Sequence, residues 1–312
     1  MTPELSIVVP VYNEEESLPL LADAIQKALA SYPKTYECVL VDDGSSDRSP
    51  QVLRDLAKSD PRFKPVFLRR NFGQTAALSA GFDHAHGPII VTLDADLQND
   101  PADIPMLVAK IEEGYDLVSG WRQNRQDSMI RNFPSFVANW IIGRVTGIKL
   151  HDSGCTLKAY RSEVAKNLNL YGEMHRFIPA LASWMGINLV EVPVRHHPRK
   201  LGKSKYGLSR IWRVFLDLIT VKFLLSYSAS PIQFFGKFGF LSSALGWLIC
   251  AATVIMKFTQ DRTITGNPLF YLFTFLQIIA VQLVLIGLVA EMNTRTYHEV
   301  QRKKTYVVRK DA

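Results

Sequence analysis

The sequence predicts an α/β domain over residues 1–207, followed by a membrane-associated helical region. Three observations carry this prediction. Short apolar runs alternate with helix-like segments through the first part of the chain, which is typical of a sheet covered by helices. Two long stretches near the C-terminus contain no charged residue, and a basic segment precedes them. The chain is 47% hydrophobic over 312 residues, which is high for a soluble enzyme, and the apolar excess is concentrated in these stretches.

The predicted domain begins with a buried strand over residues 5–11, a continuous apolar run. The acidic segment 13–17 then opens a helix to about residue 31. The remaining predicted elements follow in the same alternation, with strands over 36–41, 64–68, 89–93 and 117–120 and helices over 51–58, 75–84 and 103–113. Apolar strands separated by helices favour a parallel sheet with both faces covered.

Two uncharged stretches predict a transmembrane hairpin within residues 234–290. Residues 238–256 contain no charge over 19 residues, and residues 263–290 contain none over 28. Each is long enough to cross a hydrocarbon core of about 30 Å, and Gly266-Asn267-Pro268 marks a turn between them. The alternative is a buried helical pair of a soluble domain. Basic residues concentrate outside the hairpin, so the positive-inside rule places residues 1–230 and the basic tail 291–312 in the cytoplasm.

Residues 208–230 predict an amphipathic helix lying in the membrane interface. Apolar side chains recur at helical spacing, while Arg210, Arg213 and Asp217 fall on another face; the alternative is an ordinary core-facing helix. Charge is unevenly distributed: residues 1–194 carry a net −5, residues 195–222 a net +7, and residues 291–312 a net +3. Because the basic charge marks particular places, we expect a membrane partner and no nucleic-acid partner.

Acidic residues follow two of the predicted strands. Asp42 and Asp43 close the second strand, and Asp94 and Asp96 close the fourth. Ligands of open α/β sheets bind at the carboxyl ends of strands. Asp94-Ala95-Asp96 can therefore hold a hard cation, Mg²⁺ or Mn²⁺, beside a diphosphate, with Gln98 adding a neutral oxygen. The alternatives are a solvated loop for this segment and a plain turn for Asp43-Gly44-Ser45.

Several motifs resemble those of family 2 glycosyltransferases, which have the GT-A fold. They are Ile7-Val8-Val9-Pro10-Val11-Tyr12-Asn13-Glu14-Glu15, Val41-Asp42-Asp43-Gly44-Ser45-Ser46-Asp47, Asn71-Phe72-Gly73-Gln74 and Leu93-Asp94-Ala95-Asp96-Leu97-Gln98. Three later segments resemble the polyprenyl-phosphate glycosyltransferases, which include dolichol-phosphate mannose synthases and bacterial undecaprenyl-phosphate glucosyl- and aminoarabinosyl-type transferases. These segments are 122–128, 152–155 and 202–206, and the two predicted spans follow them.

The resemblance implies a nucleoside-diphosphate sugar as donor. The residues that it implies for donor binding are Pro10, Tyr12, Glu14, Asp42, Asp43 and Gln74, with Asp94, Asp96 and Gln98 holding the metal ion. The metal would neutralise charge on the departing nucleotide, so Asp94 and Asp96 also count as catalytic. The basic residues Arg199, Lys200, Lys203 and Lys205 are candidates to contact the donor phosphates. Their alternative role is purely membrane-surface charge.

The resemblance also implies a polyprenyl phosphate as acceptor. A phosphate monoester is largely dianionic at neutral pH, so it needs charge screening more than deprotonation. The candidates to grip it are Arg122, Arg125, Arg131 and Ser135, since arginine forks fit phosphate oxygens; the alternative is solvated surface arginines. Asp152 is the candidate to orient the acceptor or act as a base, and its alternative is a turn-capping role. Glu173 is a further candidate for that role. His175-Arg176 are candidates to touch the sugar or the phosphate, and the alternative for Arg176 is a pair with a neighbouring acid.

These expectations combine into an integral membrane enzyme, an inverting hexosyltransferase. It would move one sugar, with UDP-glucose as the favoured donor, to polyprenyl phosphate at the cytoplasmic membrane surface. GDP-mannose and a UDP-aminoarabinose derivative are alternative donors. A non-catalytic, membrane-anchored nucleotide-sugar-binding protein is the alternative of another class. Two spans offer little helix–helix surface, which makes a homodimer or homotetramer an expected assembly.

Overall fold

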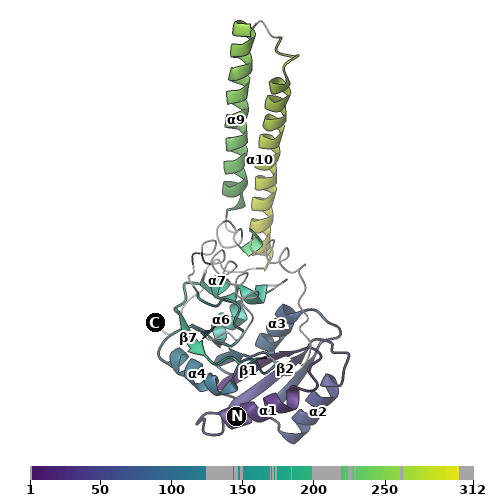
Figure 1. The fold of residues 1–312 in the computed structure, drawn as a ribbon, viewed down its shortest axis with the longest axis vertical. Coiled ribbons are helices and arrows are strands. Elements are labelled where there is room, and N and C mark those ends of the chain that lie inside the picture. The colour runs from purple at the N-terminus through teal and green to yellow at the C-terminus, as the bar shows by residue number, and fades with distance from the viewer. Residues whose placement is uncertain are drawn as a thin grey trace. The chain divides into compact units, whose positions relative to one another are not determined.

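The computed structural model describes residues 2–123, 143, 147, 150–168, 170, 172, 174–183, 185–198, 219–221, 223, 227, 230–260 and 263–301. The chain divides into two compact units, Met1–Val221 and Lys222–Ala312. The first unit carries a sheet with helices, and the second carries two long helices (Figure 1). The predicted combination of an α/β domain and two apolar helices is confirmed.

The described residues of the first unit form a seven-stranded sheet in the order β3-β2-β1-β4-β6-β5-β7. Its strands are β1 (Leu5–Val11), β2 (Tyr36–Asp42), β3 (Phe63–Phe67), β4 (Ile89–Thr92), β5 (Leu117–Arg122), β6 (Lys158–Arg161) and β7 (Leu189–Val194). β1 pairs in parallel with β2 and β4, β2 with β3, and β5 with β7. The predicted run 5–11 coincides with β1, whose side chains are almost all buried because both faces of the sheet are covered.

The expectation of a wholly parallel sheet is wrong at β6. This strand runs antiparallel to both β4 and β5 and lies between them. It was not expected, because it has four residues and a lysine at its start. Its insertion leaves β4 and β5 parallel to each other, so both strands end at the same edge of the sheet.

Helices cover both faces of this sheet (Figure 1). They are α1 (Leu18–Ala28), α2 (Ser49–Ser59), α3 (Gln74–His84), α4 (Ile104–Glu112), α6 (Ser162–Asn167) and α7 (Ile178–Ser183), with short 3₁₀ helices η1 (Pro101–Asp103) and η2 (Met174–Arg176). The helix expected from residue 14 begins only at Leu18. The Ser17 hydroxyl donates hydrogen bonds to the carbonyl and the carboxylate of Glu14, so a turn precedes the helix. Pro19 follows in the first turn of α1, where proline is well tolerated.

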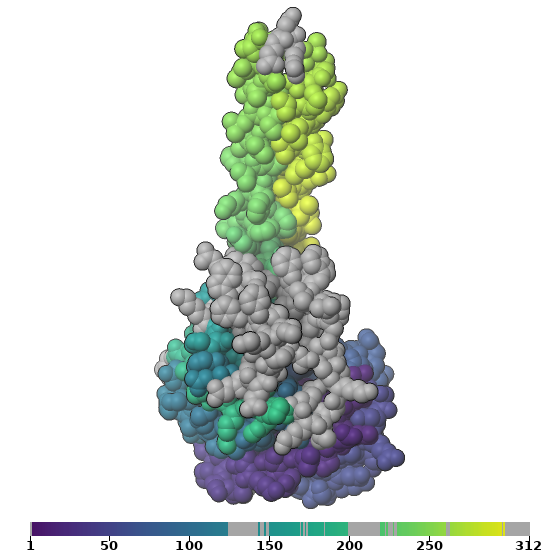
Figure 2. All heavy atoms as spheres, in the orientation of Figure 1, coloured from purple at the N-terminus to yellow at the C-terminus, as the bar shows by residue number. Residues whose placement is uncertain are grey.

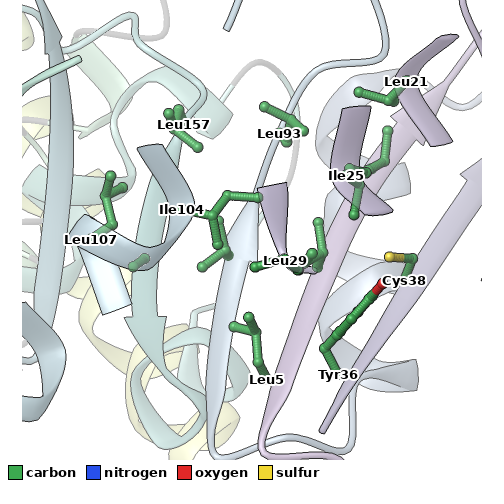
Figure 3. Close-up of a cluster of buried hydrophobic side chains, with 14 of the residues drawn as sticks. Leu5, Leu21, Ile25, Leu29, Tyr36, Cys38, Leu93, Ile104, Leu107 and Leu157 are labelled. Atoms are coloured by element: carbon green, nitrogen blue, oxygen red, sulfur yellow. The ribbon is translucent and has the colours of Figure 1, made fainter. Parts of the chain in front are cut away.

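The core consists of one apolar cluster on each face of the sheet. On the first face, side chains of α1 and α4 pack on β1 and β2; Figure 3 shows Leu21, Ile25 and Leu29 of the α1 region and Ile104 and Leu107 of α4 around Leu5 and Cys38. On the second face, α3 packs on alternate residues of β1 and β2, and the cluster continues through α6 and α7 with residues of β4, β5 and β6. Burial on both faces holds the strand ends, and the loops that follow them, in place.

The second unit contains α9 (Pro231–Gln260) and α10 (Pro268–Gln301), which pack along their length (Figure 2). Segments 231–259 and 268–294 are long and apolar enough to cross a membrane. Only 17% and 11% of their most apolar windows are buried in the protein, which argues against a helical pair buried inside a soluble domain. Ser243 and Gln277 join the helices: the Ser243 hydroxyl donates to Gln277 Oε1 at 2.9 Å, and Gln277 Nε2 donates to the Ser243 carbonyl at 3.1 Å.

The predicted interfacial helix over residues 208–230 lies mostly outside the described residues and stays a prediction. Of the apolar residues that recur at helical spacing in it, Ile219 and Phe223 are described, and Ile219 is half exposed.

Candidate active site

A pocket of about 190 Å³ opens at the edge where β1, β2 and β4 end. Its walls come from four loops that are far apart in the sequence. The lining residues are Pro10, Val11, Tyr12, Glu14, Asp43, Asn71, Gly73, Gln74, Ala77, Asp94, Ala95 and Asp96. The predicted donor-binding residues Pro10, Tyr12, Glu14, Asp43 and Gln74 therefore meet the predicted metal ligands Asp94 and Asp96 in one place. Their individual roles stay predictions.

The loops after β1 and β2 are tied together at the pocket. The backbone N–H of Asn13 donates to the Ser45 hydroxyl at 2.9 Å, and the Asn13 side chain accepts from the backbone N–H of Ser46 at 2.8 Å. Asn13 adopts a φ of 53°, a region that asparagine tolerates better than most residues. Asp42 is buried and does not line the pocket; its Oδ1 accepts from the backbone N–H of Ser45 at 3.4 Å.

Asp43 holds the loop that forms the far wall of the pocket. Its two carboxylate oxygens accept from the backbone N–H groups of Phe72 and Gly73, at 2.7 and 2.9 Å. Burial raises the pKa of Asp43 and these two hydrogen bonds oppose the rise. Gly44 has a φ of 66°, and a Cβ there would lie 2.4 Å from the backbone of Arg70. The glycine thus permits the close approach that brings Asn71 and Gly73 to the pocket.

Replacing Asp43 by Asn should weaken nucleotide binding roughly tenfold. The amide would keep one acceptor oxygen but turn an NH₂ group toward a backbone N–H, at a cost of about 1–1.5 kcal/mol in binding. Titration calorimetry with UDP measures this effect. Asp55→Asn, which removes an exposed carboxylate bound to Gln51 on α2, is the matched control. Equal affinity of the Asp43→Asn and parent proteins would show that the loop does not depend on this carboxylate.

The predicted metal-binding segment follows β4 as a tight turn. Asp94 Oδ1 accepts from Gln74 Nε2 at 2.9 Å, and Asp96 Oδ1 accepts from the backbone N–H of Gln98 at 3.1 Å. Leu97 has a φ of 60°, which closes the turn. Burial raises the pKa of Asp94, the neighbouring carboxylate of Asp96 raises it further, and Thr156, Arg122 and Lys158 oppose the rise.

This arrangement fits a divalent cation. In the described part of the chain, no three His, Cys, Asp or Glu side chains are grouped so that they could hold a metal ion alone. Mg²⁺ commonly uses one or two carboxylates and completes its shell with substrate phosphates and water. Two crowded carboxylates at the floor of an open pocket match that need, because a cation would relieve the repulsion that raises the pKa of Asp94.

Arg122 and Asp152, predicted to serve the acceptor, form a buried ion pair. Arg122 Nε donates to Asp152 Oδ2 at 2.6 Å, and its Nη2 donates to Oδ1 at 2.9 Å. Glu191 supports this pair from β7 by accepting from the backbone N–H groups of His151 and Asp152. Both Asp152 oxygens thus accept from Arg122, and the carboxylate keeps further acceptor sites because its two oxygens offer about four lone pairs. The predicted acceptor roles of the two residues remain predictions.

His175 lies behind the pocket. Its Nδ1 is 2.8 Å from the Thr75 hydroxyl of α3, and its ring lines a small void with Asp94 and Lys158. Burial, together with the charges of Arg176 and Lys158, lowers the pKa of His175 to about 3. The imidazole is therefore neutral at physiological pH and supports the site by packing and hydrogen bonding.

As pH falls, the free energy of unfolding should decrease more steeply in the parent protein than in a His175→Asn variant. In the unfolded chain the pKa of this histidine is near 6.5. Above about pH 6.5 the imidazole is therefore neutral in both states, and its contribution to the free energy of unfolding is fully present. As pH falls from there toward 3, protonation favours the unfolded state by about 1.4 kcal/mol per pH unit. Denaturant unfolding of the parent and of His175→Asn, compared from pH 7 to 5, measures the difference. Parallel pH profiles would contradict this expectation.

Several predicted residues lie outside the described part of the chain: Arg125, Arg131, Ser135, Glu173, Arg199, Lys200, Lys203 and Lys205. The segment just before the last four is described. The His197 backbone N–H donates to the carbonyl of Gln98 at 2.8 Å, and Arg195 pairs with Asp103. Sequence reasoning missed Thr156 and Lys158 near Asp94. A lysine inside the apolar run 157–160 was the available signal, because lysine is rarely buried.

The sheet order, the pocket at its carboxyl edge and the acidic turn after β4 define a glycosyltransferase of the GT-A fold class. A solved structure of the same fold, glucosyl-3-phosphoglycerate synthase from Mycobacterium tuberculosis in complex with Mn²⁺, UDP and phosphoglyceric acid, aligns with a TM-score of 0.55. That alignment covers 72% of this chain and 78% of the other at 18% identity.

The chain belongs to glycosyl transferase family 2, whose sequence profile matches residues 6–168. Dodecaprenyl-phosphate galacturonate synthase of Rhizobium johnstonii is 45% identical, over 98% of this chain and 92% of that protein. Undecaprenyl-phosphate 4-deoxy-4-formamido-L-arabinose transferase of Edwardsiella ictaluri is 40% identical, over 97% of this chain and 93% of that protein. Both alignments cover nearly the whole chain.

Proposed function

We propose that this protein transfers one sugar from a nucleoside-diphosphate sugar to a polyprenyl phosphate at a membrane surface. The observation that carries the proposal is the 45% identity with dodecaprenyl-phosphate galacturonate synthase over 98% of this chain. The pocket, with its acidic floor at the carboxyl edge of the sheet, supports a nucleotide-sugar donor. The two apolar helices support an acceptor that stays in the bilayer.

A nucleotide-linked galacturonate is our first choice of donor, because the galacturonate synthase has the higher identity of the two relatives. A nucleotide-linked formamidoarabinose is the second choice. UDP-glucose and GDP-mannose, which the sequence suggested, stay predictions and belong in the same donor panel. The relatives' names favour an acidic or amino sugar over either of these hexoses.

In the proposed reaction, Asp94 and Asp96 hold Mg²⁺ or Mn²⁺, which would neutralise charge on the departing nucleotide. Gln74 orients Asp94 through its hydrogen bond of 2.9 Å. Tyr12 and Asp43 line the donor side of the pocket, and Asp43 keeps the wall at Gly73 in place. The phosphate oxygen of the acceptor attacks the anomeric carbon from the face opposite the leaving nucleotide. A single displacement of this kind inverts the anomeric configuration.

The membrane arrangement is part of the proposal. Basic residues at the outer ends of the hairpin favour a cytoplasmic location for residues 1–230 and for the tail 291–312. The segment 208–230 would set the height of the catalytic domain at the headgroups, with Arg131 and Ser135 gripping the acceptor phosphate. Assembly into dimers or tetramers belongs to the same proposal.

A donor panel tests the function. Purified protein in nanodiscs receives polyprenyl phosphate, Mg²⁺ or Mn²⁺ and one radiolabelled donor at a time. We expect label in an organic-extractable lipid, with nucleotide-linked galacturonate as the best donor. Nucleotide binding without any lipid-linked product would instead identify a non-catalytic nucleotide-sugar-binding protein. A preference for UDP-glucose would keep the reaction class and overturn the proposed donor.

A further inference from the structure

A lysine buried in the sheet lies beside the candidate active site. Lys158 is the first residue of β6, and only 2% of its surface is exposed. It lies opposite Thr92 of β4 and Ser119 of β5 in the sheet. Because β6 runs antiparallel to both strands, its amino end lies at the edge where they continue into Asp94 and Arg122.

The ammonium group of Lys158 holds the turn that carries Asp152. Its Nζ donates hydrogen bonds to the carbonyl oxygens of Cys155 and, at 3.5 Å, of Ser153. Asp152 in the same turn receives both hydrogen bonds of the Arg122 fork. Lys158 is therefore connected to this ion pair through the backbone of residues 152–155.

Packing alone does not require a lysine at this place. Its neighbours Leu157, Ala159 and Tyr160 are buried in the two apolar clusters. Burying an ammonium group is costly, and a well-packed apolar side chain would avoid that cost. Lys158 and Asp94 line the same small void, so the turn that Lys158 holds lies next to the candidate site.

We propose that Lys158 is a positioning residue for sugar transfer. Its ammonium group fixes the turn 152–155, and through that turn it holds the Arg122–Asp152 pair beside Asp94. The inference rests on the proposed transfer reaction and is independent of which sugar is transferred.

Lys158→Met tests the role, because methionine fills similar space without charge or hydrogen-bond donors. We expect kcat to fall about 10²-fold, the size of effect that a small misplacement of catalytic groups produces. The KM for the donor and the affinity for UDP with Mn²⁺ should stay within about threefold, because the pocket walls are unchanged. The kcat of Lys158→Arg should be at least about tenfold higher than that of Lys158→Met, since a guanidinium also donates to carbonyl oxygens. Lys110→Met, on the exposed face of α4, is the control.

Two further measurements test the route through the turn. In a double-mutant cycle with Asp152→Asn, the losses in kcat should be less than multiplicative, because both changes release the same ion pair. Hydrogen exchange of residues 152–155 should be faster in Lys158→Met than in the parent. Multiplicative losses, or unchanged exchange, would overturn this route.

The kinetic outcomes separate this inference from the proposed function. A parent protein that transfers no sugar from any donor contradicts the function, and the exchange of residues 152–155 still decides whether Lys158 holds the turn. An active parent with an equally active Lys158→Met variant overturns the positioning role. A variant that loses UDP affinity in proportion to kcat also overturns it, because Lys158 would then serve only the fold of the pocket.

Discussion

Replacing Asp96 by Asn should lower the rate of sugar transfer by roughly 10²–10³-fold, equivalent to about 3–4 kcal/mol of transition-state stabilisation. The amide keeps the size of the side chain but removes one of the two carboxylates at the floor of the pocket. Asp94 alone would bind the proposed cation weakly. Because that cation neutralises the charge that grows on the departing nucleotide, transfer should suffer far more than folding does.

The measurement is initial-rate transfer with Mg²⁺ or Mn²⁺ titrated over both proteins. EDTA should stop the parent enzyme, and either metal should restore it. Asp23→Asn, whose carboxylate pairs with Lys27 on the exposed face of α1, controls for the loss of an acidic charge. Near-parental turnover of Asp96→Asn in saturating Mn²⁺ would remove Asp96 from the metal site.

Replacing Arg122 by Met should destabilise the catalytic domain by about 3–5 kcal/mol, because it leaves the buried carboxylate of Asp152 without its partner. For a domain of this size the expected fall in Tm is roughly 6–20 °C. Transfer should also fall strongly, since the pair lies beside Asp94 and Arg122 is a candidate to contact the acceptor phosphate. Thermal unfolding in detergent and transfer assays below the unfolding temperature measure the two effects separately.

A pair with similar fork geometry but a more exposed arginine provides the control for Arg122. Arg62 donates to both carboxylate oxygens of Asp60 at 2.7–3.0 Å, yet the arginine side chain is 46% exposed. Arg62→Met should cost about 1 kcal/mol or less, since water screens the charges. Arg122→Met combined with Asp152→Asn should be more stable than Arg122→Met alone. Equal destabilisation by Arg62→Met and Arg122→Met would contradict the importance of burial.

Features that depend on residues close together in the chain could be predicted from the sequence. The apolar run 5–11 predicted a buried strand, and it is β1. The uncharged stretch 238–256 lies within α9, and residues 268–290 of the second stretch lie within α10, because a long apolar segment satisfies its backbone groups best as a helix. Asp94 and Asp96 were correctly expected at the end of a strand, since the apolar run 89–93 stops where the carboxylates begin.

The tertiary structure alone decided which distant groups meet. Asp43, and not Asp42, lines the pocket, because successive side chains at a strand end point to opposite sides. Arg122 pairs with Asp152, which is thirty residues away in the sequence. The antiparallel strand β6 places Lys158 between the strands that lead to Asp94 and Arg122. Local propensity and hydrophobic period carry no information about strand order. That order follows from packing both faces of the whole sheet, and it decides which groups become neighbours of Asp94 and Asp152.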